Sequence, residues 1–221
     1  MCSSDLHQDK AGGGTNPWNP PFLETSSTTG INIPAAASVI LHSRGTAAAL
    51  TQGWAELTAG DGIAGYLIFT NTVPGRPDQD ATSSAAAPAS RVLMPFDNAS
   101  GNVAAVAIVN PTSSTETIHV TFRLANGTVT VGDLPTLPPL GHAAFVLPQQ
   151  FASVAGQSGL AEFYSASGNF SLIALRFNAT VSSTSAPVYV QSGPPVINDP
   201  GVIYPPDYYY YAEPPAVQAE K

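Results

Sequence analysis

The chain repeats part of its own sequence about a hundred residues further on, and a repeat of this kind indicates a repeated structural unit. Three runs of the first copy return in the second, residues 33–41 as residues 139–147, Gly53-Trp54-Ala55-Glu56-Leu57 as Gly159-Leu160-Ala161-Glu162-Phe163, and residues 64–69 as a run ending Leu175-Arg176-Phe177. Strand-like sequence precedes the second copy, whereas almost none precedes the first. We therefore expect one complete module behind the C-terminal half of another.

Hydrophobic residues in this region recur with a period of two, which is typical of strands. In residues 118–124 (Ile-His-Val-Thr-Phe-Arg-Leu), apolar side chains alternate with polar ones, and residues 103–109 are apolar on both faces. The dipeptide Asn126-Gly127 is a strong hairpin signal, because both residues tolerate positive φ. Pro111, Pro135, Pro138, Pro139 and Pro148 fall between the apolar runs, where a missing backbone donor does no harm.

These patterns predict an all-β chain, an antiparallel β-sandwich of immunoglobulin-like or jelly-roll-like type. We expect strands of the complete module near residues 91–96, 103–110, 117–125, 142–147, 159–165, 171–178 and 186–191. The half-module should have strands near residues 37–42, 53–58, 64–70 and 79–86, and should pack on the complete module. The predicted organisation is a flexible leader over 1–30, the half-module over 31–87, the complete module over 88–191 and a disordered Pro/Tyr-rich tail over 192–221.

Composition points to an extracellular or cell-surface location. Charged residues make up only 10% of the chain, against the roughly 25% typical of soluble domains. The net charge of -8 argues against nucleic acid as a partner. No apolar run approaches the ~20 residues of a membrane span. The single cysteine, Cys2, excludes a disulfide framework and a thiolate metal site.

The first residues suggest that the natural start of the protein is missing. Residues 1–6 (Met-Cys-Ser-Ser-Asp-Leu) resemble the translation of a sequencing-library adapter. On this interpretation Cys2 is not native, and a signal peptide would have been lost with the true N-terminus.

Several motifs together resemble an uncharacterised repeat of large secreted or surface proteins of soil bacteria. They are Gly53-Trp54-Ala55-Glu56, Gly65-Tyr66-Leu67-Ile68-Phe69, Gly75-Arg76, Leu93-Met94-Pro95-Phe96-Asp97-Asn98, Leu137-Pro138-Pro139-Leu140-Gly141-His142 and Leu175-Arg176-Phe177-Asn178. The resemblance covers residues 31–190 approximately. It implies an extracellular β-sandwich module and no catalytic motif.

Acidic loop residues are weak candidates for a calcium site. Asp78 and Asp80 follow Gly75-Arg76-Pro77, and Asp97 lies further along the chain. Ca²⁺ needs six to eight oxygen ligands at one point, and the spacing does not assemble them. Aspartates that cap loops, with an Arg76 ion pair, explain the same residues.

Glu56 and Glu162 occupy equivalent places in the two copies. An enzyme would use such residues as a paired acid and nucleophile. Repeat equivalence instead favours a structural role, such as an ion pair of Glu162 with Arg176. The histidines are His7, His42, His119 and His142, and none forms a metal-binding pair. We expect no catalytic residue, cofactor or metal.

Aromatic side chains could stack on sugar rings if they are exposed, and the candidates are Trp54, Tyr66, Tyr164 and Tyr189. Burial in the core is the alternative. Two functions remain: a non-catalytic structural or adhesive module, and a carbohydrate-binding accessory module of an extracellular enzyme whose catalytic domain is missing upstream. The expected partners are neighbouring repeats, with polysaccharide or cell-surface components as further candidates.

Overall fold

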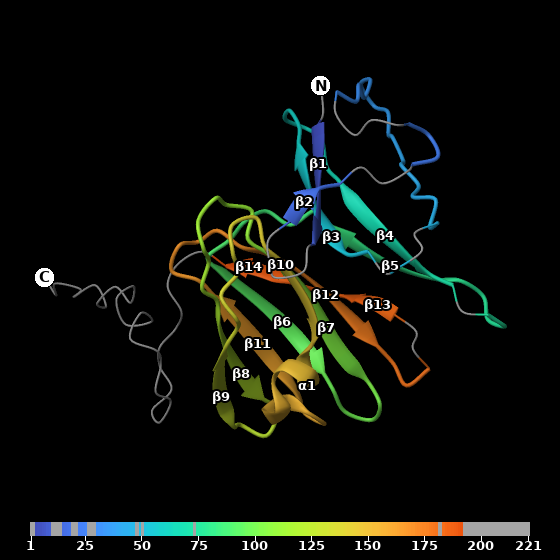
Figure 1. Cartoon of the computed structure of the whole chain (residues 1–221). Coiled ribbons are helices and arrows are strands. Elements are labelled where there is room, and N and C mark those ends of the chain that lie inside the picture. Colours follow the sequence, from blue (N-terminus) through green and yellow to red (C-terminus); the bar gives the residue numbers. More distant parts are fainter. Residues whose placement is uncertain are drawn as a thin grey trace, which may run out of the picture.

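The computed structural model describes residues 3–9, 15–18, 22–25, 30–46, 49, 51–72, 74–180 and 183–191. These residues form antiparallel strands and loops, with only two short helical turns, so the predicted all-β fold class is confirmed. Figure 1 shows two groups of strands, β6 to β14 in a sandwich and β1 to β5 beside it. No helix in the described residues has the length and apolarity that crossing a membrane requires.

The larger group is a sandwich of two sheets. One sheet has the order β10-β7-β12-β13 and the other has the order β14-β6-β11-β8-β9. The strands are β6 (Arg91–Asp97), β7 (Val103–Val109), β8 (His119–Leu124), β9 (Val129–Asp133), β10 (His142–Val146), β11 (Ser158–Tyr164), β12 (Ser171–Phe177), β13 (Ser183–Ala186) and β14 (Tyr189–Gln191). The helical turns α1 (Leu147–Gln150) and η1 (Ala152–Val154) follow β10.

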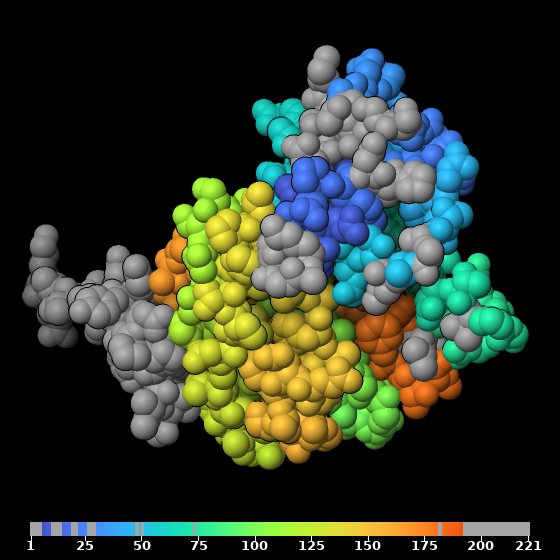
Figure 2. Space-filling model, in the orientation of Figure 1, coloured from blue at the N-terminus to red at the C-terminus, as the bar shows by residue number. Residues whose placement is uncertain are grey.

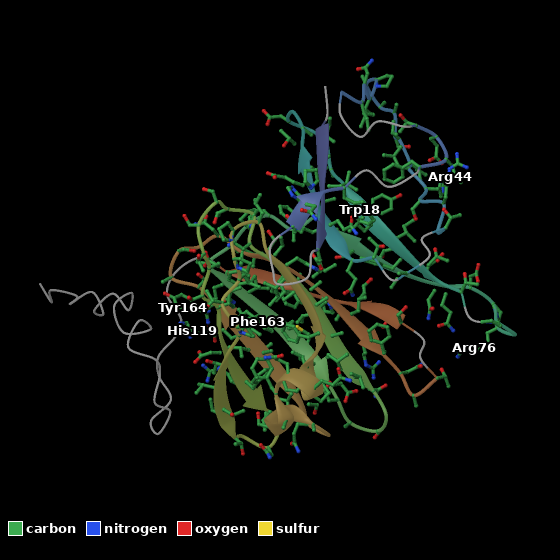
Figure 3. All side chains as sticks on the ribbon, in the orientation of Figure 1. Trp18, Arg44, Arg76, His119, Phe163 and Tyr164 are labelled. Atoms are coloured by element: carbon green, nitrogen blue, oxygen red, sulfur yellow. The ribbon has the colours of Figure 1, made fainter. Side chains whose placement is uncertain are left out.

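The core lies between these two sheets. Alternate residues of β7, namely Ala104, Val106 and Ile108, are buried, as the period of two predicts. From the facing sheet come Phe122 and Phe163, both fully buried, and Figure 3 shows Phe163 inside the sandwich. All fully buried members of this core lie within residues 89–174. The sandwich therefore has its own hydrophobic core.

The smaller group, which we call the first unit, contains two small sheets. β1 (Ser3–Asp9), β2 (Thr15–Pro17) and β3 (Gly53–Thr58) have the order β2-β1-β3, and β4 (Tyr66–Asn71) pairs with β5 (Gln79–Ser84). Large apolar side chains of β4 remain exposed here, among them Tyr66 at 66% and Ile68 at 51%.

The strands of the first unit are arranged like the second half of the sandwich. The order β2-β1-β3 corresponds to β9-β8-β11, and the pair β4-β5 corresponds to β12-β13. A Cβ added to Gly53 would lie 2.0 Å from the carbonyl oxygen of His7, and one on Gly159 would lie 2.1 Å from that of Arg123. The two glycines therefore make the same close approach to the neighbouring strand. Counterparts of β6, β7 and β10 are absent from the described part of the first unit.

The prediction of a strand near residues 37–42 is wrong. Those residues have no regular secondary structure. Their counterpart in the sandwich is β10, which pairs with β7 and with no other strand. Since the described part of the first unit has no counterpart of β7, residues 37–42 have no strand to pair with.

The prediction of a flexible leader over residues 1–30 is wrong for residues 3–9 and 15–17, which form β1 and β2. β1 pairs along β3 from Ser3↔Thr58 to Gln8↔Gly53. An unpaired edge of β3 offers backbone donors and acceptors to any extended segment, and β1 takes the place that β8 has beside β11. The predicted tail over 192–221 lies outside the described residues.

Candidate functional site

The first unit and the sandwich meet at a group of polar contacts that we call the joint. His142 Nδ1 donates a hydrogen bond to the Asp9 carboxylate at 2.8 Å, and Trp54 Nε1 donates one to the Leu140 carbonyl at 3.1 Å. The rings of His7 and Trp54 stack with centroids 4.1 Å apart and 11° between their planes. The first unit therefore contacts the sandwich here through Trp54 of the predicted half-module and Asp9 of the predicted leader.

A second set of contacts, also part of the joint, places β5 beside β13. The backbone N–H of Thr82 donates to Ser185 Oγ at 2.9 Å, and the same hydroxyl donates to the Thr82 carbonyl. Arg76, at the outer end of the β4-β5 ribbon in Figure 3, donates to the Thr180 carbonyl. These bonds align the small ribbon with the edge of the four-stranded sheet.

Two polar atoms of the joint are buried without a hydrogen-bond partner among the described residues. They are His7 Nε2 and Asp9 Oδ1. Such an atom costs roughly 1–3 kcal/mol relative to its solvated state. The bonds from His142 to Asp9 and from Trp54 to Leu140 act against this cost and couple the two units.

Glu162 is buried at 2% exposure in β11 and is paired with two arginines. Its carboxylate accepts a hydrogen bond from Arg91 Nε at 2.7 Å and lies 3.7 Å from Arg123 Nη2. The prediction of an ion pair between Glu162 and Arg176 is wrong, because Arg176 belongs to the opposite sheet and pairs with Asp97. Glu56 is exposed on β3 in the first unit. A paired-carboxylate arrangement like that of a glycosidase would need both groups beside one bond, and these two lie on different sheets.

The three calcium candidates occupy separate positions. Asp78 is exposed before β5, and Asp80 within β5 accepts a hydrogen bond from Thr70 at 2.7 Å. Asp97 ends β6 in the sandwich. In the part of the chain that the structure describes, no three His, Cys, Asp or Glu side chains gather in a group that could hold a metal ion.

The four aromatic candidates differ in exposure. Tyr164 is only 2% exposed, so it cannot stack on a sugar ring, and burial, the alternative considered from the sequence, is what the structure shows. Figure 3 shows Tyr164 next to His119, its partner in the strand register. One face of Trp54 is occupied by His7. Tyr66 and Tyr189 are exposed, on β4 and β14 in different sheets, and form no common stacking platform.

The histidines are engaged in local pairs. His119 Nδ1 lies 2.6 Å from Asp133 Oδ1 across the β8-β9 pair. His119 is only 7% exposed, so it does not lie on a solvated face. His42 pairs with Glu24 among the irregular residues of the first unit, and the resulting bonds lower the pKa of Glu24. None of these pairs includes a third metal-ligating group among the described residues.

Two buried polar clusters were not anticipated from the sequence. The Glu116 carboxylate accepts hydrogen bonds from the hydroxyls of Ser165 and Ser167. Asn110 Nδ2 donates to the carbonyls of Ser114 at 2.7 Å and Pro138 at 2.9 Å. Except for Ser114, which is four residues from Asn110, the partners are distant in sequence, so no local pattern could have marked the full clusters. The Asn110 amide satisfies backbone carbonyls of loops, and the serine hydroxyls satisfy the Glu116 carboxylate. Both clusters therefore have a structural role.

The Asp97 carboxylate at the end of β6 accepts three hydrogen bonds from described residues. The donors are the Ala99 backbone N–H at 3.0 Å, Arg176 Nη2 at 2.9 Å and Asn102 Nδ2 at 3.0 Å. The Ala99 N–H, followed by the Arg176 guanidinium, lowers the pKa of Asp97 below its ordinary value. These bonds join the turn after β6 to β12 in the opposite sheet.

Asp97→Asn should destabilise the protein at neutral pH but not in acid. A lowered pKa in the folded state contributes stability above the ordinary carboxyl pKa, and that contribution disappears as pH falls through the folded-state value. Because the side chain is 36% exposed, solvent screening limits the loss to less than about 1 kcal/mol. Urea unfolding at about pH 7 and about pH 2 measures the difference. The exposed Asp78→Asn serves as control, and an equal loss for Asp97→Asn at both pH values would contradict the assignment.

Comparison with known proteins found no matching family model, no similar curated protein and no similar solved structure.

Proposed function

We propose that this chain is a non-catalytic structural or adhesive β-sandwich module of a secreted or cell-surface protein. The joint is the observation that carries the proposal. Two units built on the same strand arrangement contact each other through His142–Asp9, Trp54–Leu140 and Thr82–Ser185. Contacts of this kind are what a string of adjoining modules needs in order to hold a defined shape, and neighbouring repeats are the expected partners.

Buried charge in the sandwich supports the same proposal. A catalytic carboxylate must reach substrate, whereas Glu162 is enclosed by Arg91 and Arg123 and Glu116 by two serine hydroxyls. The low charge content and the absence of cysteine from residues 3–221 are compatible with an extracellular location.

The test is whether the joint couples the two units. Both tryptophans, Trp18 and Trp54, lie in the first unit, so tryptophan fluorescence reports its unfolding, while far-UV circular dichroism is dominated by the sandwich. We expect the two urea transitions of the natural chain to coincide. The double substitution His142→Ala and Ser185→Ala should separate them.

The matched control is His42→Ala, because His42 is an exposed histidine outside the joint. It should leave the two transitions together. If the unmodified chain already unfolds in two separate transitions, the joint does not couple the units and the proposal loses its main support.

The exposure of Tyr66 and Tyr189 keeps a carbohydrate-binding accessory module as a second candidate. Retention on insoluble cellulose, chitin and xylan distinguishes the two. Retention that Tyr66→Ala or Tyr189→Ala abolishes would favour the second candidate. Release of soluble sugar by the purified chain would contradict both.

A further inference from the structure

Strand β4 is apolar on both faces and exposed on both. Tyr66 and Ile68 point to one side of the ribbon and Leu67 and Phe69 to the other, because side chains alternate along a strand. Their exposed fractions are 66%, 51%, 50% and 37%. A strand that is apolar on both sides is normally covered on both, and contiguous exposed apolar surface marks an interaction site.

The sandwich shows what covers the equivalent strand. β12, the counterpart of β4, has β13 on one edge and β7 on the other. Among the described residues β4 pairs with β5 alone, so the edge that corresponds to the β7 side of β12 carries no strand. Figure 2 shows the outer part of this ribbon, in blue-green, projecting from the side of the molecule.

We propose that the edge of β4 away from β5 binds an added antiparallel strand of alanine and β-branched apolar residues with the chemistry of β7, which completes the sheet of the first unit. Such a strand supplies the backbone bonds that an open edge lacks. This goes beyond the structural role proposed above and does not depend on it, since it concerns a different surface from the joint.

Side-chain size selects the occupant. In the β7–β12 pair, Ala105 lies opposite Leu175 and Ala104 opposite Arg176, which are the counterparts of Leu67 and Ile68 in the repeat. Alanine therefore faces large residues at these two positions, whereas Ile108 lies opposite Leu172. β4 carries Tyr66, Leu67, Ile68 and Phe69, which are all large. An isologous β4–β4 pair between two copies of the chain would set large residues against large ones. A β7-like strand avoids that crowding and presents no charge to the apolar faces.

The experiment titrates the full chain with a fluorescent peptide of the sequence Asn102 to Asn110, carrying added lysines at one end for solubility. We expect saturable binding and slower hydrogen exchange at the amides of residues 66–71. The same peptide with Ala107→Pro should not bind, since proline removes a donor in the middle of the strand. Ile68→Lys in the chain should weaken binding by about tenfold or more, because binding would then bury a charge.

Leu67→Lys provides a second edge variant, and Val131→Lys on the exposed edge strand β9 is the matched control that should bind normally. Circular dichroism verifies that each variant is folded. Absence of binding, equal binding of the proline peptide, or protection at β12 instead of β4 would overturn the proposal. So would a dimer of the unmodified chain in sedimentation that Ile68→Lys dissociates, because the occupant would then be a second copy.

Discussion

Glu162→Ala should lower the free energy of unfolding by about 3–5 kcal/mol, the cost of removing one partner of a buried ion pair. Arg91 is itself only 8% exposed, and its Nε donates a hydrogen bond to the Glu162 carboxylate at 2.7 Å. The substitution would therefore leave the Arg91 guanidinium without a counter-charge inside the sheet. Arg123 is more exposed and can turn towards solvent. Urea unfolding followed by far-UV circular dichroism measures the loss.

Glu56→Ala is the matched control, because Glu56 has the equivalent place in the repeat but is exposed on β3. Its effect should stay within about 0.5 kcal/mol. The double substitution Arg91→Met and Glu162→Leu should recover most of the stability, since apolar residues can replace a buried ion pair without loss. A small effect of Glu162→Ala would mean that the pair contributes nothing, and would reopen the question of what Glu162 does.

Most strands of the sandwich could be predicted because local alternation reports burial directly. β6, β7, β8, β11 and β12 are strands of six or seven residues whose apolar residues face one core, and the predicted ranges fall on them. The strands that the pattern did not mark, β9 and β13, lie at sheet edges. An edge strand has fewer neighbours, so polar residues such as Ser183 to Ser185 are tolerated there and no alternation is needed.

Pairing partners could not be predicted, because they depend on distant parts of the chain. Residues 37–42 have a strand-like sequence but no partner strand, whereas residues 3–9 have little apolar alternation and become β1 beside the open edge of β3. For the same reason the sequence indicated Arg176 as the partner of Glu162, while the sheet order gives Arg91. For Tyr164 the sequence left exposure and burial open, and the fold decides for burial, with 2% of the residue exposed.

Gly159→Ala should destabilise the sandwich by about 3 kcal/mol, at the upper end of what overpacking costs. The added Cβ would lie 2.1 Å from the Arg123 carbonyl oxygen and 2.9 Å from Leu124 Cα, and both are backbone atoms that cannot turn away. β11 is held on both sides, by β6 and by β8, so the strand cannot shift without breaking one of the two ladders. Far-UV circular dichroism should show an earlier urea transition.

Gly53→Ala introduces the same conflict in the first unit, 2.0 Å from the His7 carbonyl, but β3 is paired on one side only and can move away from β1. We therefore expect a smaller loss than for Gly159→Ala. Because the joint couples the two units, the shift should appear both in tryptophan fluorescence, where Trp54 stacks on His7, and in circular dichroism. Equal losses from the two substitutions would contradict the greater freedom of β3. If neither substitution changed the urea transition, the equivalence of the two glycines would be contradicted. The repeat from which the arrangement of the first unit is interpreted would then lose its basis.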